Sequence, residues 1–125
     1  MSKRNLKDLV IAVDFDGTCV KHAFPRVGED IGAVPVLKKL VEAGAKLILW
    51  TMRDKGSLFN AVQWFKQNEI TLYGVQRNPI QHEWTSSPKC YASLFIDDAA
   101  LGAPLIYEDG EKPYIDWKKV EEMLF

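Results

Sequence analysis

Runs of apolar residues recur along the chain and predict a series of buried β-strands. The clearest run spans residues 9–15, and others cover 45–50, 72–75, 91–96 and, more briefly, 105–107. In the first two runs nearly every position is apolar, rather than every second one. That pattern is typical of strands in a parallel sheet that is covered on both faces.

Between these runs the apolar residues recur with helical spacing. Residues 33–43 carry apolar side chains at i, i+3 and i+4, and Gly44 suits the end of that helix. A second helix is predicted over 58–67 with Ser57 as its N-cap, and a third over 116–124. Strands that alternate with helices predict the α/β class with a mainly parallel sheet.

Length and composition are those of an ordinary globular protein. The 125 residues suit a single domain, 1–125, and the net charge of −1 argues against an extensive nucleic-acid surface. Cys19 and Cys90 lack metal or redox spacing and are interpreted as reduced thiols of a cytoplasmic protein, with no membrane partner. The irregular stretch 17–32, here called the flap, is long for a strand-to-helix connection, and loops of that length are often functional.

Acidic residues follow two of the predicted strands. Asp14 and Asp16 are spaced i, i+2 at the end of the first strand, so both carboxylates can converge on one site. The pair Asp97-Asp98 follows the fourth strand, and Thr51 follows the second. Because the carboxyl ends of parallel strands meet at one edge, where ligands bind, these residues are expected to form a site. Carboxylates this close repel one another, and Mg²⁺, which takes oxygen ligands, is the simplest remedy.

The full ordered set is more specific than any of its parts. It consists of Asp14-Phe-Asp16-Gly-Thr after the first strand, Thr51 after the second, Lys89 before the fourth, and Asp97-Asp98 after it. That order resembles the haloacid-dehalogenase-like superfamily of Mg²⁺-dependent phosphohydrolases, over roughly residues 10–102. The resemblance implies a three-layer α/β/α sandwich with a Rossmann-like sheet, and the short flap implies a member without a large cap domain.

The resemblance also implies roles for individual residues in a phosphatase, a hydrolase acting on phosphoric ester bonds. Asp14 would be the nucleophile that becomes an aspartyl phosphate, and Asp16 would give and take the proton. Thr51 would bind the phosphoryl oxygens, and Lys89 would neutralise their charge. The Mg²⁺ ligands would be Asp14, the backbone carbonyl of Asp16, Asp97 and Asp98. Phosphoryl transfer needs chiefly positioning and charge neutralisation, which these groups supply.

Without a large cap the site is expected to be open. An open site suits a phosphorylated small molecule or polymer end, or a homo-oligomer whose second subunit covers it. Arg53, just after Thr51, is the first candidate for a substrate contact, with an ion pair to Asp54 as the equal alternative. Arg77 and Asn78, after the third strand, are further candidates. Weaker candidates in the flap are His22 and Arg26.

Two other functional classes stay open at this point. A receiver domain of a signalling system also gathers Asp, Thr and Lys around Mg²⁺. However, its phosphorylated Asp follows the third strand, and here that strand, 72–75, ends without one. A non-catalytic phosphate-binding protein on the same scaffold is the second alternative, although the acid set is intact.

Overall fold

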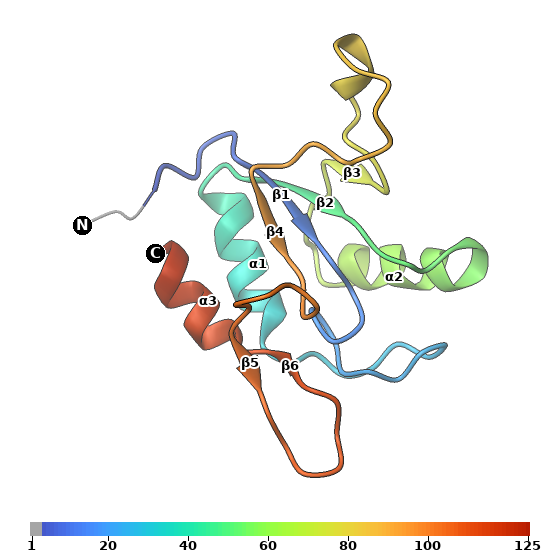
Figure 1. The fold of residues 1–125 in the computed structure, drawn as a ribbon, viewed down its shortest axis with the longest axis vertical. Helices are drawn as coiled ribbons and strands as arrows, with labels where there is room; N and C mark the ends of the chain where they lie inside the picture. The colour runs from blue at the N-terminus through green and yellow to red at the C-terminus, as the bar shows by residue number, and fades with distance from the viewer. Residues whose placement is uncertain (1–3) are drawn as a thin grey trace.

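The computed structural model describes residues 4–125 and contains a parallel sheet, a small hairpin and three α-helices (Figure 1). The elements, in chain order, are β1 (Val10–Val13), α1 (Ala33–Glu42), β2 (Lys46–Leu49), α2 (Lys55–Gln67), β3 (Gly74–Val75), the 3-10 turn η1 (Gln81–Glu83), β4 (Leu94–Ile96), β5 (Leu105–Ile106), β6 (Tyr114–Ile115) and α3 (Trp117–Leu124). The predicted strands and helices are present in their expected order.

The four strands of the main sheet run parallel in the order β3-β2-β1-β4. Ile11 of β1 lies opposite Leu47 of β2 on one side and Leu94 of β4 on the other. Strands β1, β2 and β4 therefore end close together at one edge. This arrangement confirms the predicted α/β class with a parallel sheet, although each strand is shorter than the apolar run that predicted it.

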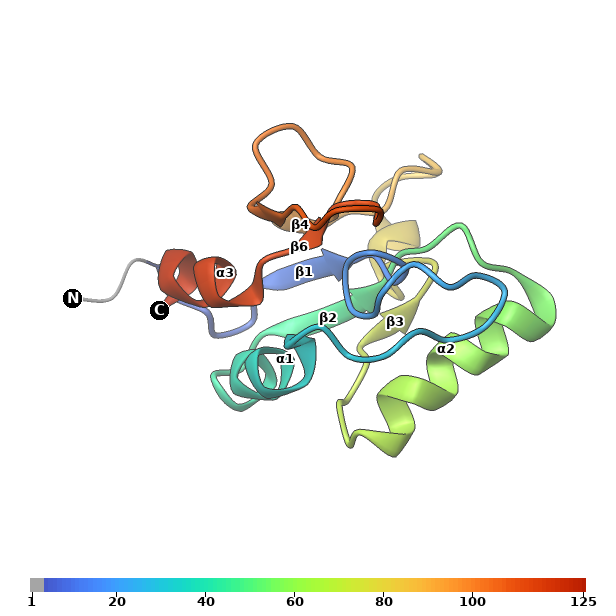
Figure 2. The ribbon, with the colours of Figure 1, turned by 90° about the horizontal axis from the view of Figure 1, so that it is seen from below.

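All three helices pack on one face of this sheet. The crossovers β1-α1-β2 and β2-α2-β3 step across the sheet in the same direction, so right-handed connections put α1 and α2 on the same side. In the view of Figure 2 both helices lie below β1. Helix α3 contacts α1. The main core lies between these helices and the sheet, and includes Ile11, Val13, Leu37 and Phe65.

The opposite face is covered differently from the prediction. The crossover from β3 to β4, residues 76–93, is fully described and contains the turn η1 but no α-helix. Ala12 and Ile48 alternate with the core residues and are buried outside the main core, as is Cys90 of the crossover. The crossover therefore adds no α-helix to this face, and the third helical layer of the expected sandwich is missing from the described residues. The apolar pattern could predict a covered face but not the structure that covers it.

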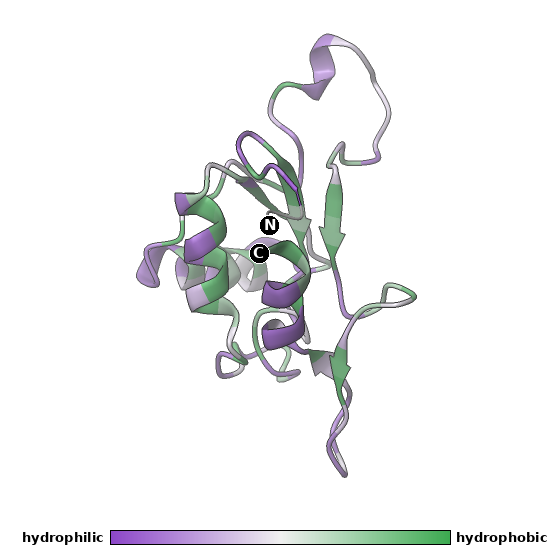
Figure 3. Cartoon of the chain, turned by 90° about the vertical axis from the view of Figure 1, so that its left-hand side faces the viewer, coloured by the Kyte–Doolittle hydropathy of each residue, from purple (hydrophilic) through white to green (hydrophobic). Residues whose placement is uncertain are grey.

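Two element boundaries differ from the sequence prediction for identifiable reasons. Helix α2 begins at Lys55, three residues early, because Asp54 and Ser57 form a reciprocal capping box at its start. Ser57 is thus the third helical residue rather than the N-cap. Strand β6 was not predicted, since its two residues pair antiparallel with β5 across a turn and carry no long apolar run. Figure 3 shows the strands as largely hydrophobic and the helices as two-faced.

The flap lies beside the β5–β6 hairpin. Two isolated bridges, Asp16 to Val20 and Val20 to Asp30, shape it. Lys21 of the flap forms ion pairs with Glu108 and Glu111 of the hairpin, at 3.8 and 3.4 Å. None of the helices in the described part of the chain is long and apolar enough to cross a membrane.

Candidate functional site

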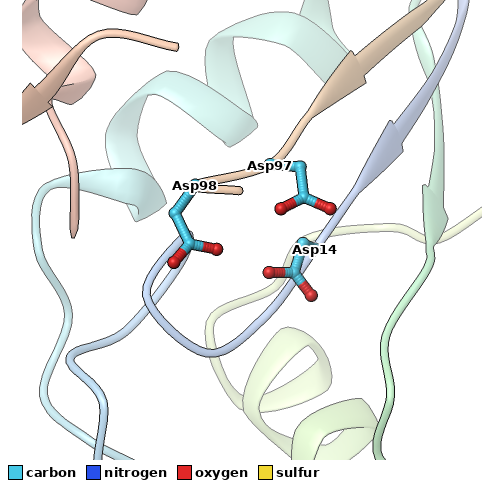
Figure 4. A group of neighbouring side chains, drawn as sticks. All are labelled: Asp14, Asp97 and Asp98. Carbon is cyan, nitrogen blue, oxygen red and sulfur yellow. The ribbon is translucent and has the colours of Figure 1, made fainter. Parts of the chain in front are cut away.

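Three carboxylates gather beyond the carboxyl ends of β1 and β4. Asp14 follows β1, and Asp97 and Asp98 follow β4 (Figure 4). Each offers one oxygen atom, and these three atoms lie within 4.8 Å of one another. We call this group the acid cluster. It arises directly from the topology, because β1 and β4 are hydrogen-bonded neighbours that run in the same direction.

The acid cluster makes the ionisation of Asp14 unfavourable. The pKa of this carboxyl group is raised from 3.8 to about 7, chiefly by burial and also by the charges of Asp97 and Asp98 and a hydrogen bond with Asp98, against a lowering hydrogen bond from the Phe15 backbone. A divalent cation would reverse this effect by favouring the ionised form. Three carboxylate oxygens at this spacing fit a hard cation such as Mg²⁺, which prefers oxygen ligands.

Thr18 and His22 hold the acid cluster in place. The Thr18 hydroxyl accepts a hydrogen bond from the Asp98 backbone N–H at 3.0 Å. It lies 3.1 Å from Asp14 Oδ2 and 3.3 Å from Asp98 Oδ1, so it donates to one of them. His22 Nε2 lies 3.2 Å from the Pro113 carbonyl and 3.3 Å from Asp98 Oδ2. Because a carbonyl only accepts, Nε2 carries a proton and also points that N–H toward Asp98.

The turn after β1 depends on one glycine and on the end of the chain. Gly17 has φ +78°, and a Cβ there would overlap the imidazole of His22 and lie 2.6 Å from Asp98 Oδ2. The Gly17 carbonyl accepts from the Ile115 backbone N–H at 3.0 Å, and the Thr18 carbonyl accepts from Trp117 Nε1 at 2.6 Å. Ile115 and Trp117, close to the start of α3, thus support the turn that carries Asp16.

Asp16 has a different environment from the acid cluster. Its two carboxylate oxygens accept hydrogen bonds from Nε and one terminal nitrogen of Arg53, both at 2.8 Å. The Arg53 side chain is 1% exposed, so this is a buried, bidentate ion pair. The acid pair of the sequence motif is therefore divided: Asp14 joins the acid cluster and Asp16 joins a cation.

Arg53 is placed neither as a free substrate contact nor as a partner of Asp54. Its remaining N–H groups donate to the carbonyls of Pro25 and Arg26 in the flap and of Ser57 in α2, at 2.8–3.2 Å. The predicted pairing with Asp54 is replaced by pairing with Asp16, because Asp54 is used to cap α2. Sequence proximity pointed to the wrong carboxylate.

Thr51 lies at the end of β2, and a glutamine that the sequence did not single out shapes its loop. The Thr51 hydroxyl accepts from the Arg53 backbone N–H at 3.2 Å. The Gln76 side chain accepts from the Thr51 N–H at 2.9 Å and donates to the carbonyls of Thr51 and Arg53, at 2.7 and 3.1 Å. Gln76 thus fixes the backbone from which Thr51 and Arg53 project. Its position just after β3 was the available signal.

The structure does not bring Lys89 to the acid cluster. Ser93 is already hydrogen-bonded to Val10 at the start of β1, and Lys89 precedes Ser93 by four residues. Figure 1 shows the crossover reaching the end of the molecule opposite the flap and the hairpin. Lys89 is exposed and its Nζ contacts no charged group among residues 4–125. The short spacing between Lys89 and Asp97 places the lysine at the wrong end of β4.

Arg77 and Asn78 also belong to the crossover. Asn78 is buried and donates to the Tyr91 carbonyl at 3.1 Å, while its Oδ1 accepts from the Ile80 N–H. Arg77 is exposed and shares with Asn78 a cavity of about 500 Å³ within the crossover. The chain turns back after β3, since a Cβ at Gly74 would overlap the Arg77 carbonyl. These residues therefore shape the crossover rather than the acid cluster.

The fold and the site together define an α/β protein with a parallel sheet and an acidic site at the carboxyl edge. No family model matches the chain, and no curated protein is similar to it. A solved structure of a conserved protein from Bacteroides thetaiotaomicron is 36% identical, with a TM-score of 0.76, over 94% of this chain and 89% of that one. The chain belongs to the same family as that conserved protein, whose description names no function.

Proposed function

We propose that this protein is an Mg²⁺-dependent phosphohydrolase that acts through an aspartyl-phosphate intermediate on Asp14. The observation that carries the proposal is the acid cluster, in which Asp14, Asp97 and Asp98 offer three oxygens within 4.8 Å at the edge where parallel α/β sheets bind ligands. A purely structural set of three acids would be costly, because each charge opposes the others. The raised pKa of Asp14 reflects burial and that opposition.

The order of residues at the strand ends adds support from the family resemblance. Asp14, Thr51 and Asp97 follow three adjacent strands, β1, β2 and β4. We therefore propose the haloacid-dehalogenase-like fold without a large cap, in which an irregular segment takes the place of the third layer's helix. We also propose a cytoplasmic location. The site is open, so it suits a phosphorylated small molecule or polymer end, or a second subunit that covers it.

The proposed hydrolysis takes place as two displacements at phosphorus. A carboxylate oxygen of Asp14 forms a bond to phosphorus as the ester P–O bond breaks, and Asp16 gives its proton to the departing oxygen. The oxygen of a water molecule then bonds to phosphorus as the bond between Asp14 and phosphorus breaks, Asp16 takes a proton from that water, and inorganic phosphate leaves with Asp14 regenerated. A bound Mg²⁺, held by the acid cluster and the Asp16 carbonyl, would supply charge neutralisation for the phosphoryl group. Thr51 would bind its oxygens.

One contact in the structure restricts this chemistry. Both oxygens of Asp16 accept hydrogen bonds from Arg53, so Asp16 must release one of these contacts and take up a proton at that oxygen before it can protonate the departing oxygen. Arg53 is also the fixed cation beside the motif, whereas Lys89 is not close enough for that role. The proposal therefore assigns proton transfer to Asp16 and charge neutralisation to Mg²⁺ without Lys89.

The test is hydrolysis of a generic aryl phosphate with and without Mg²⁺, compared between the natural protein and Asp14→Asn. We expect activity that is lost on chelation and restored by Mg²⁺, and at least about a thousandfold loss in Asp14→Asn with an unchanged far-UV CD spectrum. Full activity in that variant would exclude the mechanism. Stable phosphorylation of Asp14 without turnover would favour a receiver-like protein, and phosphate binding without hydrolysis would favour a binding protein.

A further inference from the structure

We infer that Arg53 is a positioning residue that couples the seating of the flap to the placement of Asp16. The part of this inference that concerns catalysis rests on the proposed function, but the coupling itself does not. Arg53 follows β2, Asp16 follows β1, and the contacted flap residues are 24–26, so three separate segments meet at one guanidinium.

The guanidinium group has no donor left for a substrate. An arginine side chain carries five N–H groups in a fixed planar fork. Here two of them bind the oxygens of Asp16, and the other three bind the carbonyls of Pro25, Arg26 and Ser57. A substrate phosphate could be bound only if one of these contacts were given up. The side chain is therefore built to join parts of the protein.

Aromatic rings enclose the same group from two segments. The Arg53 guanidinium carbon lies 5.0 Å from the centroid of the Phe15 ring and 5.1 Å from that of the Phe24 ring. Phe15 is fully buried in the core, whereas Phe24 belongs to the flap and is 62% exposed. The flap thus supplies one ring and two carbonyl acceptors, and the segment just after β1 supplies the other ring and the carboxylate.

Loss of the flap contacts would change how Arg53 holds the Asp16 carboxylate. If residues 24–26 moved away, two N–H groups of a side chain that is 1% exposed would lose their acceptors. The guanidinium would then turn toward water, and its bidentate geometry with Asp16 would be lost. Conversely, removal of the Asp16 carboxylate frees two of the five N–H groups and weakens the hold on the flap. This reciprocity can be measured without any enzyme activity.

The experiment follows tryptic cleavage of the Arg26–Val27 bond in the folded, full-length protein by mass spectrometry. We expect Arg53→Gln to speed this cleavage by roughly tenfold, because two hydrogen bonds to the flap are lost. We expect Asp16→Asn to speed it by about threefold, although no hydrogen bond joins the Asp16 side chain to residues 24–26. The double variant should be no faster than Arg53→Gln alone. Lys66→Gln, which removes an exposed charge from α2, is the matched control and should match the natural protein.

Two outcomes would overturn the inference. One is an unchanged cleavage rate in Arg53→Gln; the other is a faster rate in Arg53→Gln together with no change in Asp16→Asn. If Arg53→Gln does not fold, as judged by CD, the Asp16→Asn variant alone decides, since it keeps the buried cation.

A second measurement tests the consequence for catalysis. A misplaced proton donor harms a substrate with a poor leaving group more than one with a good leaving group. We therefore expect Arg53→Lys to lower kcat for an alkyl phosphate at least about tenfold more than for a nitrophenyl phosphate. An equal loss for both would overturn the catalytic part of the inference. If the natural protein hydrolyses neither, the proposed function fails while the cleavage result still decides the coupling.

Discussion

Asp14 and Asp16 are two residues apart, yet they lie in opposite electrostatic environments. Asp14 faces two further carboxylates, Asp97 and Asp98, and burial with their charges raises its pKa to about 7. Asp16 faces a buried guanidinium that meets both of its oxygens at 2.8 Å. In the first region three acids face one another, whereas the second region contains a cation, Arg53.

This difference follows from where the neighbouring strands lead. Strand β4 continues into a second acidic pair beside Asp14, whereas β2 continues through Thr51 to Arg53 beside Asp16. A motif of two acids is thus divided by its neighbours: Asp14 lies among other acids, and Asp16 is paired with a cation. Each region can be altered by its own substitutions, and these should change the free energy of unfolding in opposite directions.

The largest effect on stability is expected from replacement of Arg53, the cation that pairs with Asp16. Arg53→Met leaves the Asp16 carboxylate partly buried without its partner, and breaking such a pair costs about 3–5 kcal/mol in the free energy of unfolding. Asp14→Asn should instead leave the metal-free protein as stable or more stable, since it relieves repulsion. Urea unfolding at pH 8 in EDTA measures both.

The double variant Arg53→Met with Asp16→Asn separates charge from packing. A neutral amide needs no cation, so we expect the double variant to be more stable than Arg53→Met alone. If the two substitutions were simply additive, the ion pair would contribute little and the proposed contrast between the regions would be wrong.

A smaller effect is expected from adding Mg²⁺ to the first region. At a concentration 100 times its dissociation constant, a ligand that binds only the folded state adds about 2.7 kcal/mol to stability. We expect a rise in Tm with Mg²⁺ that Asp97→Asn reduces strongly and Lys66→Gln leaves intact. A similar rise of Tm in Asp97→Asn would mean that Mg²⁺ binds elsewhere on the protein.

In the absence of metal, the pH dependence of stability should report on the acid cluster as well. Below pH 3.8 Asp14 is protonated in both the folded and the unfolded chain. As pH rises, the unfolded chain releases this proton near 3.8, whereas the folded chain keeps it until about 7. The folded state therefore loses stability from this group as pH rises from about 4 through 7.

The measurement is Tm in EDTA between pH 4 and pH 8, for the natural protein and for Asp14→Asn. The loss of Tm across this range should be smaller in the variant, and Mg²⁺ should reduce it in the natural protein, because the cation favours the ionised carboxylate. The same loss in Asp14→Asn would assign the pH dependence to other groups.

Much of the acidic site could be predicted because it depends on strand ends. Apolar runs identified β1 and β4, parallel pairing made their ends neighbours, and the acids that follow them met as expected. The side-chain partners could not be predicted in the same way. Arg53 pairs with Asp16 across two strands, and Gln76 holds the Thr51 loop from a third, so neither contact leaves a local pattern in the sequence.

The path of the crossover was equally beyond the apolar pattern. The sequence predicts no helix or strand over residues 76–90, and the structure has only the short turn η1 there. Their direction is set by contacts such as the Asn78 bond to Tyr91 and the Gln81 bonds to Ser87 and Lys89. The order of motifs along the chain suggested that Lys89 reaches the site, but motif order carries no information about the direction of a loop.

Lys89→Gln is accordingly expected to have the smallest effect. Lys89 precedes Asp97 by eight positions, and the strand between them runs from the opposite edge of the sheet toward the acid cluster. An extended chain rises about 3.3 Å per residue, which exceeds the reach of a lysine side chain over that separation. We expect kcat/KM for an aryl phosphate to change by less than about twofold, which is under 0.5 kcal/mol. A loss of a hundredfold or more would mean that the crossover folds over the acid cluster when substrate binds, and would join the two ends of β4 in one site.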